Sequence, residues 1–194
     1  MPSKSLLDRG FPSKAEKISE QYRSTLGISK FDPLDAFSLA SYLKVTIFGI
    51  DELASDLVEK DFTILKNPEK FSAMWMPNDI GKKIILHNTC HSEKRQQSNL
   101  MHELAHIILE HNIPNELAQL CFTFGLHYFN PKHEQEAKYL GGCLQITRPG
   151  LQWALKHSFS EDQMSDYYNA SVDMIKYRLN VTGVLVQRKY QLHK

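Results

Sequence analysis

The sequence is poor in cysteine and has no excess of charge of either sign. Its 194 residues include only three cysteines, and none of them forms a CxxC pair. This argues against a secreted disulfide framework and against a cysteine-rich zinc site, and it indicates ordinary reduced thiols. Lysine and arginine total 23 against 22 aspartates and glutamates. No block of like charges forms the kind of tail that binds nucleic acid.

Long apolar runs are also missing. No stretch approaches the roughly 18 apolar residues that a membrane-spanning helix needs. Charges at Lys4, Asp8 and Arg9 interrupt the opening residues, where a signal peptide would carry its apolar segment. We therefore expect a soluble, cytoplasmic protein with no membrane partner. Hydrophobic residues make up 42% and charged residues 23% of the chain, a balance typical of globular proteins and not of disordered ones.

The chain length suits one hydrophobic core with appendages more than two full domains. We expect residues 1–30 to form an N-terminal helical segment that belongs to the same domain as the core. Residues 31–150 are expected to form the core itself, and residues 151–194 a C-terminal helical element.

Apolar periodicity, helix caps and turn residues predict the secondary structure. Together they predict an α+β fold that is mostly helical and contains a small antiparallel sheet. The expected helices cover 11–29 up to Gly27, Asp32 to Leu43, a segment after Asp51, 93–111 after Ser92, 131–146 after Asn130 and before Arg148-Pro149-Gly150, and two segments that open at Ser160 and Ser171. The expected strands are 45–50, 71–76 and 82–87, the last two forming a hairpin.

Histidine is the residue type that stands out, with nine in the chain and most of them in its middle third. Inside the predicted helix 93–111 the sequence MHELAH contains an HExxH motif. His102 and His106, four residues apart, lie on one face about 6 Å apart along the axis, so both can bind one zinc ion. Glu103 lies beside that face, where its carboxylate can take a proton from water. The motif therefore predicts two metal ligands and a general base.

A catalytic zinc site usually has a third protein ligand. In metzincins it is a histidine ten residues after the first, but that position here is Asn112. His111 lies about 180° from His102 on a continued helix, so we expect it to face away. The next predicted helix offers Glu134 and Glu136, which point in nearly opposite directions on a helix, so at most one of them can coordinate.

Four segments, in order, resemble the ImmA/IrrE family of metallopeptidases: IILHN, EKRQQSNLMHELAHIILEH, EQEAKYLGGCL and MIKYRLNVTGV. The resemblance spans most of residues 10 to 184. It implies a gluzincin-like, zincin-like fold for the core, with Zn²⁺ held by the two HExxH histidines and by a glutamate of an ExxAD or ExxAN segment. Matched to that segment, Glu134 is the implied ligand and Glu136 the second choice. Lys138 replaces the usual Asp or Asn, which can orient a histidine ligand.

The resemblance also implies what the protein does. Family members resemble site-specific proteases that cut a partner transcriptional repressor. The expected activity is therefore that of a zinc endopeptidase. Its expected substrate is a helix-turn-helix repressor of a mobile-element or stress-response system. Tyr128, Tyr139 and His133 are nearby polar residues, but the group that stabilises the oxyanion is unassigned. By analogy with other zincins, strand 82–87 is expected to pair with an extended substrate.

Two alternatives stay open. The segment from Ser160 to Asn180 has the rhythm of a helix-turn-helix, but Lys176 and Arg178 are the only basic residues of its second helix. Direct DNA binding is therefore the less favoured function. The change at Lys138 leaves a second alternative, a non-catalytic zinc-containing module that binds a partner without cutting it.

Overall fold

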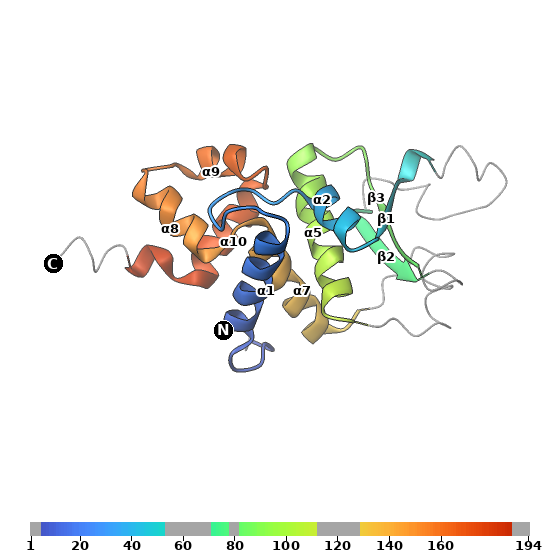
Figure 1. Ribbon diagram of the computed structural model, residues 1–194, viewed down its shortest axis with the longest axis horizontal. Helices are drawn as coiled ribbons and strands as arrows, with labels where there is room; N and C mark the ends of the chain where they lie inside the picture. The colour runs from blue at the N-terminus through green and yellow to red at the C-terminus, as the bar shows by residue number, and fades with distance from the viewer. Residues whose placement is uncertain (1–4, 53–70, 78–81, 112–128, 188–194) are drawn as a thin grey trace.

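The structure is a computed structural model that describes residues 5–52, 71–77, 82–111 and 129–187. Figure 1 shows the C-terminal helices at one end, a group of longer helices in the middle and a small sheet at the other end. In chain order the elements are α1 (Phe11–Thr25), α2 (Ala36–Tyr42), β1 (Thr46–Gly49), β2 (Ala73–Pro77), β3 (Lys83–His87), α5 (Glu93–Ile108), α7 (Pro131–Gln145), α8 (Arg148–Lys156), α9 (Glu161–Tyr167) and α10 (Val172–Thr182).

The predicted α+β class is confirmed, but the sheet is mixed and not antiparallel throughout. The expected hairpin is present, because β2 pairs antiparallel with β3 and Trp75 lies opposite Ile85. β1 pairs parallel with β3 on the other side, so the strand order is β1-β3-β2. A parallel pair needs a long connection between its strands, and local sequence patterns do not reveal such a pairing.

Several predicted helix caps are present. The Asn130 side chain accepts hydrogen bonds from two backbone N–H groups in the first turn of α7. Ser160 and Gln163 form a reciprocal capping box at the start of α9. Ser171 caps α10 through its side-chain oxygen. In each case a short polar side chain replaces the missing partner of an N-terminal N–H group, as the sequence pattern predicts.

Two helix starts differ from expectation. α2 begins later than predicted, because Asp35 is its cap and accepts from the Ser38 N–H at 2.7 Å. The sequence pattern does not predict α8, because Arg148-Pro149-Gly150 is typical of the end of a helix. Thr147 instead caps a new helix, and its Oγ1 accepts from the Gly150 N–H at 2.9 Å. Pro149 is tolerated there because a first-turn N–H has no partner within the helix.

Other expectations are tested only in part. The helix predicted after Asp51 falls mainly on residues 53–70, which lie outside the described residues. Cys90 and Cys143 are both free thiols, the first exposed and the second buried, and Cys121 lies outside the described residues. Among the helices that the structure describes, none is long and apolar enough to cross a membrane.

The crossing of α5 and α7 lies at the centre of the fold, with α1 against α7 and the sheet against α5 (Figure 1). Gly141 makes the close approach possible. A Cβ atom at Gly141 would lie only 3.0 Å from the carbonyl oxygen of Met101 and 3.1 Å from the Cα of His102. α7 therefore packs directly on the backbone of the HExxH segment, which brings its own first turn beside that motif.

A second apolar cluster is formed by the C-terminal helices, with Ile146, Leu151 and Ile175 among its buried members. It is tied to the rest of the chain by Arg178 of α10, whose guanidinium donates to the carbonyl oxygen of Ile146 and forms an ion pair with Glu16 of α1. The division of the chain near residue 150 remains a prediction.

Candidate metal centre

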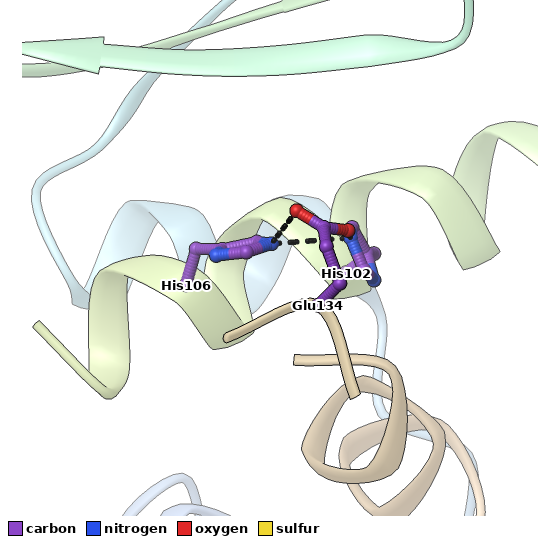
Figure 2. A group of neighbouring side chains, drawn as sticks. All are labelled: His102, His106 and Glu134. Atoms are coloured by element: carbon purple, nitrogen blue, oxygen red, sulfur yellow. Dashed lines mark hydrogen bonds and ion pairs between the residues drawn. The ribbon is translucent and has the colours of Figure 1, made fainter. Parts of the chain in front are cut away.

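Three side chains from two helices converge between α5 and the start of α7. His102 and His106 lie one turn apart on α5, and Glu134 lies in the first turn of α7. Figure 2 shows the carboxylate of Glu134 reaching the ring nitrogen of His106, with His102 on its other side. The Nε2 atoms of the two histidines are 3.1 Å apart. Glu134 places Oε2 at 3.2 Å from His102 Nε2 and Oε1 at 3.5 Å from His106 Nε2.

The chemistry and spacing of this group fit a zinc ion. Two imidazoles and one carboxylate are a common donor set for catalytic zinc. Bonds of about 2.0–2.1 Å in a tetrahedral site place neighbouring donor atoms about 3.3 Å apart, close to the separations of 3.1, 3.2 and 3.5 Å found here. All the candidate ligand atoms lie within 4.8 Å of one another. These three residues could therefore hold one metal ion.

His106 has the protonation state that a metal ligand needs. Burial and the neighbouring His102 lower the pKa of His106 to about 3. Its imidazole is therefore neutral at physiological pH. Only the neutral ring offers a nitrogen lone pair to a metal ion.

Glu103, the predicted general base, is buried between α5 and β2. Its Oε2 accepts a hydrogen bond from the backbone N–H of Trp75 at 3.0 Å. Burial raises the pKa of Glu103 to about 7, although the nearby His102 and this hydrogen bond oppose the shift. A carboxyl group with such a pKa can take up and release a proton near neutral pH, as a general base must.

The strand expected to bind substrate is not the one that the structure exposes. β3 is the central strand, paired along its length with β1 on one side and β2 on the other. The expectation that strand 82–87 pairs with substrate was therefore wrong, because its backbone groups already have partners. Among the described residues β2 pairs only with β3. The N–H of Trp75 donates to Glu103, so the unpaired edge of β2 faces the HExxH helix.

Glu136, the second choice for the metal ligand, is directed elsewhere. Its Oε2 lies 3.1 Å from the Nε2 of His111. The structure therefore brings Glu134 to the two HExxH histidines, whereas Glu136 contacts His111 and is not one of the three side chains that converge. The two glutamates point in different directions because they are two residues apart on α7.

His111 does not face away from the site, and this expectation was wrong. α5 ends at Ile108, and Glu110 adopts a left-handed conformation with φ of 55°. The chain turns back there, so the His111 N–H donates to the His106 carbonyl oxygen at 3.0 Å, a Schellman-type helix end. His111 Nδ1 then lies 3.0 Å from His106 Nδ1. Because the left-handed residue is a glutamate and not a glycine, the sequence does not mark this helix end.

The oxyanion-stabilising group stays unassigned. Tyr139 is buried in the core, where its ring packs edge-on against Phe11. His133 stacks on His111 with ring centroids 4.1 Å apart. Tyr128 lies outside the described residues. Neither of the two described candidates is one of the side chains that converge at the metal centre.

Comparison with known proteins agrees with this geometry. The family model Peptidase_M78, described as the IrrE N-terminal-like domain, matches residues 40–180. The chain belongs to this peptidase family. The match runs from α2 to α10 and includes every side chain of the candidate metal centre. The resemblance to the ImmA/IrrE family is thereby confirmed, and with it a metal-dependent peptidase class. No curated protein matches the chain.

Lys138 stands where the resemblance to the family implies an Asp or Asn. Its ammonium group lies over the ring of Tyr177 on α10, 4.7 Å from the ring centroid. The side chain is therefore engaged in a cation–π contact with the C-terminal helices. A lysine has no acceptor atom, so it cannot receive the hydrogen bond of a histidine N–H as an Asp or Asn can.

Proposed function

We propose that this IrrE-like peptidase is a cytoplasmic zinc endopeptidase of the gluzincin type. It hydrolyses a peptide bond in a partner protein, a helix-turn-helix transcriptional repressor of a mobile-element or stress-response system. The observation that carries the proposal is the convergence of His102, His106 and Glu134 beside the buried carboxylate of Glu103. Family membership supports the peptidase class, and the resemblance to ImmA/IrrE proteins supports the choice of partner.

In this proposal His102, His106 and Glu134 hold the zinc ion. A zinc ion in such a set supplies Lewis acidity, which makes water more acidic and the scissile carbonyl more electrophilic. Glu103 takes the proton of the attacking water and later delivers it to the leaving amine nitrogen. Its Oε2 is fixed by the Trp75 N–H, so Oε1 is the atom that carries the proton. The pKa of Glu103, about 7, suits both transfers.

The edge of β2 is the proposed guide for the substrate. An extended peptide can add to an exposed strand edge through backbone hydrogen bonds. β1 and β2 are the two edge strands of the described sheet, and of these it is β2 whose central residue, Trp75, binds the Glu103 carboxylate. A peptide paired with β2 therefore lies next to the proposed base and along the HExxH helix.

Replacement of the proposed base tests this function. Glu103→Gln removes the proton acceptor but none of the three proposed ligands, so we expect zinc binding to persist and cleavage to fall below detection. The assay co-expresses the enzyme with candidate helix-turn-helix repressors and follows each repressor by mass spectrometry. Glu20→Gln, at an exposed glutamate of α1, is the matched control and should cleave like the wild type. Equal cleavage by the Glu103 variant and the wild type would contradict the proposal.

A non-catalytic zinc-containing module is the second candidate, because the acceptor of the family pattern is replaced by Lys138, which contacts Tyr177. For this candidate, Glu103→Gln relieves repression as well as the wild type does, with the repressor intact. Direct DNA binding has less support. Of the two basic residues on α10, Arg178 is fully buried and Lys176 lies 3.9 Å from Glu161, which leaves little positive surface for phosphate contacts.

A further inference from the structure

A chain of buried polar side chains leads away from the candidate metal centre. His106 directs Nε2 towards His102 and Glu134. Its other nitrogen, Nδ1, lies 3.0 Å from Nδ1 of His111, and the Nε2 of His111 lies 3.1 Å from Oε2 of Glu136. His106, His111 and Glu136 are 7%, 6% and 9% exposed. At such burial, water cannot readily replace these partners, so the hydrogen bonds have to be made within the chain.

The positions of the protons along this chain follow from its far end. A carboxylate can only accept, so the proton between Glu136 and His111 is on His111 Nε2. A neutral His111 then has a bare Nδ1, which must accept a hydrogen bond from His106 Nδ1. With its proton on Nδ1, the neutral His106 has its lone pair on Nε2. That lone pair is directed at the other two proposed ligands.

His111 is held in this role by contacts from three directions. Its backbone N–H donates to the His106 carbonyl oxygen at 3.0 Å. One face of its ring stacks on His133, with an angle of 4° between the ring planes. Glu136, which receives its Nε2–H, comes from α7, the helix that also carries Glu134. The hydrogen-bond chain therefore joins the end of α5 to the helix that supplies the third proposed ligand.

We propose that His111 and Glu136 are positioning residues, which fix His106 in the tautomer whose Nε2 lone pair faces the metal centre. The proposal rests on the proposed function, because it assigns a role toward the metal that His102, His106 and Glu134 would hold. Residues that orient a metal-bound histidine in other proteins change metal affinity by about 10–100-fold when they are replaced. We expect a loss in that range when the hydrogen bond to His106 is removed.

The test compares three variants by zinc affinity, measured in competition with a chromophoric chelator. His111→Phe keeps a ring of similar shape but has no nitrogen, so it should bind zinc about 10–100-fold more weakly. His111→Asn retains an acceptor that can take the place of Nδ1, so it should recover part of that loss. His133→Phe keeps a flat aromatic ring that can stack on His111 and leaves the hydrogen-bond chain intact, so it should bind zinc like the wild type. The melting temperature of each metal-free variant reports whether it folds.

Nitrogen-15 NMR of the zinc-loaded protein supplies a readout that stability does not affect. In the wild type the His106 ring should carry its proton on Nδ1, in slow exchange with water. In the Phe variant that proton should exchange faster, and in the Asn variant it should be protected again. The Asn variant also decides the matter if the Phe variant does not fold.

Three outcomes are informative. If zinc binds the Phe and Asn variants as tightly as the wild type, with the His106 proton unchanged, the positioning role is wrong and the proposed function stands. If His133→Phe weakens zinc binding as much as His111→Phe, the loss does not require a broken hydrogen bond to His106, which also overturns the proposal. If the wild type itself binds no zinc, the proposed function fails and the positioning role fails with it.

Discussion

Charged groups are buried in two regions of the molecule, and their surroundings differ. Near the C-terminal helices, the guanidinium of Arg178 is 0% exposed, pairs with the carboxylate of Glu16, donates to a carbonyl oxygen and lies over the ring of Tyr139. A buried cation thus meets an anion in direct contact. That arrangement balances its own charge without any ligand, so removal of either partner would leave an unpaired buried charge.

At the crossing of α5 and α7 the carboxylates face imidazole rings instead. Glu134 lies against His102 and His106, Glu136 lies against His111, and Glu103 accepts from a backbone N–H. The neutral ring of His106 does not cancel a negative charge, but it does offer a lone pair to a cation. The comparison indicates that the first region pairs its buried cation with an anion within the folded chain, whereas the second has a donor set that could take up a metal ion.

The largest effect on stability should come from breaking the ion pair at the C-terminal helices. Arg178→Met leaves Glu16 without its buried partner, so the free energy of unfolding should fall by about 3–5 kcal/mol. Urea denaturation measures this change. Lys176→Met, at an exposed lysine of the same helix, is the control and should change it by less than about 0.5 kcal/mol. Comparable losses in the two variants would remove the distinction between buried and exposed cations.

Zinc binding should stabilise the other region, and this gain in stability should depend on the histidines there. A ligand that binds only the folded protein stabilises it by about 2.7 kcal/mol at a concentration one hundred times its dissociation constant. We expect this gain for the wild type and its loss after treatment with a chelator. His102→Phe should gain nothing from zinc, whereas Glu20→Gln should gain as much as the wild type. Calorimetry with and without zinc measures the difference, and equal gains for wild type and His102→Phe would contradict it.

The two neighbouring glycines of α7 allow the regions to be perturbed separately. Gly141→Ala places a Cβ against the backbone of α5, so α7 must shift and carry Glu134 with it. Both zinc affinity and stability should decrease, the latter by about 1–3 kcal/mol. Gly142→Ala instead places a Cβ 2.6 Å from Cδ of the Arg178 side chain. It should therefore lower stability and leave zinc affinity unchanged. A reversal of this pattern in zinc titrations would show that the helix crossing does not set the geometry of the site.

The smallest expected effect concerns the left-handed residue that turns the chain at the end of α5. Glu110→Gly relieves a φ of 55° and should raise stability by about 0.5–1 kcal/mol without changing zinc affinity. Glu110→Val cannot adopt this conformation easily, so it should displace His111 and weaken zinc binding. Thermal unfolding and chelator competition together test the pair. If the valine variant binds zinc normally, the turn at Glu110 does not position His111.

The sequence could predict the parts of the site that depend on local geometry. The HExxH spacing places His102 and His106 on one helical face whatever the rest of the fold does, and the caps at Asn130 and Ser171 are satisfied within one turn. The choice between Glu134 and Glu136 was different. Helical geometry showed only that one of them could coordinate, and the resemblance to a family selected Glu134.

Other features depended on contacts that local patterns do not record. β1 joins β3 across a long stretch of chain, so the mixed sheet and the central place of β3 could not be foreseen. His111 was misplaced because the helix was extended three residues too far. On a continued helix His111 would lie nine residues, or about 180°, from His102, whereas the left-handed turn at Glu110 brings its ring against His106. A glutamate at the left-handed position concealed the true helix end, and with it the contact between His111 and His106.

Anomalous diffraction at the zinc edge, from crystals grown with zinc, tests the central claim most directly. We expect one zinc ion at bonding distance, about 2.0–2.2 Å, from Nε2 of His102, Nε2 of His106 and the carboxylate of Glu134. His111 should lie behind His106 and make no bond to the ion. An empty position between these three side chains in the presence of excess zinc, or an ion closed off by a fourth protein ligand, would contradict the account.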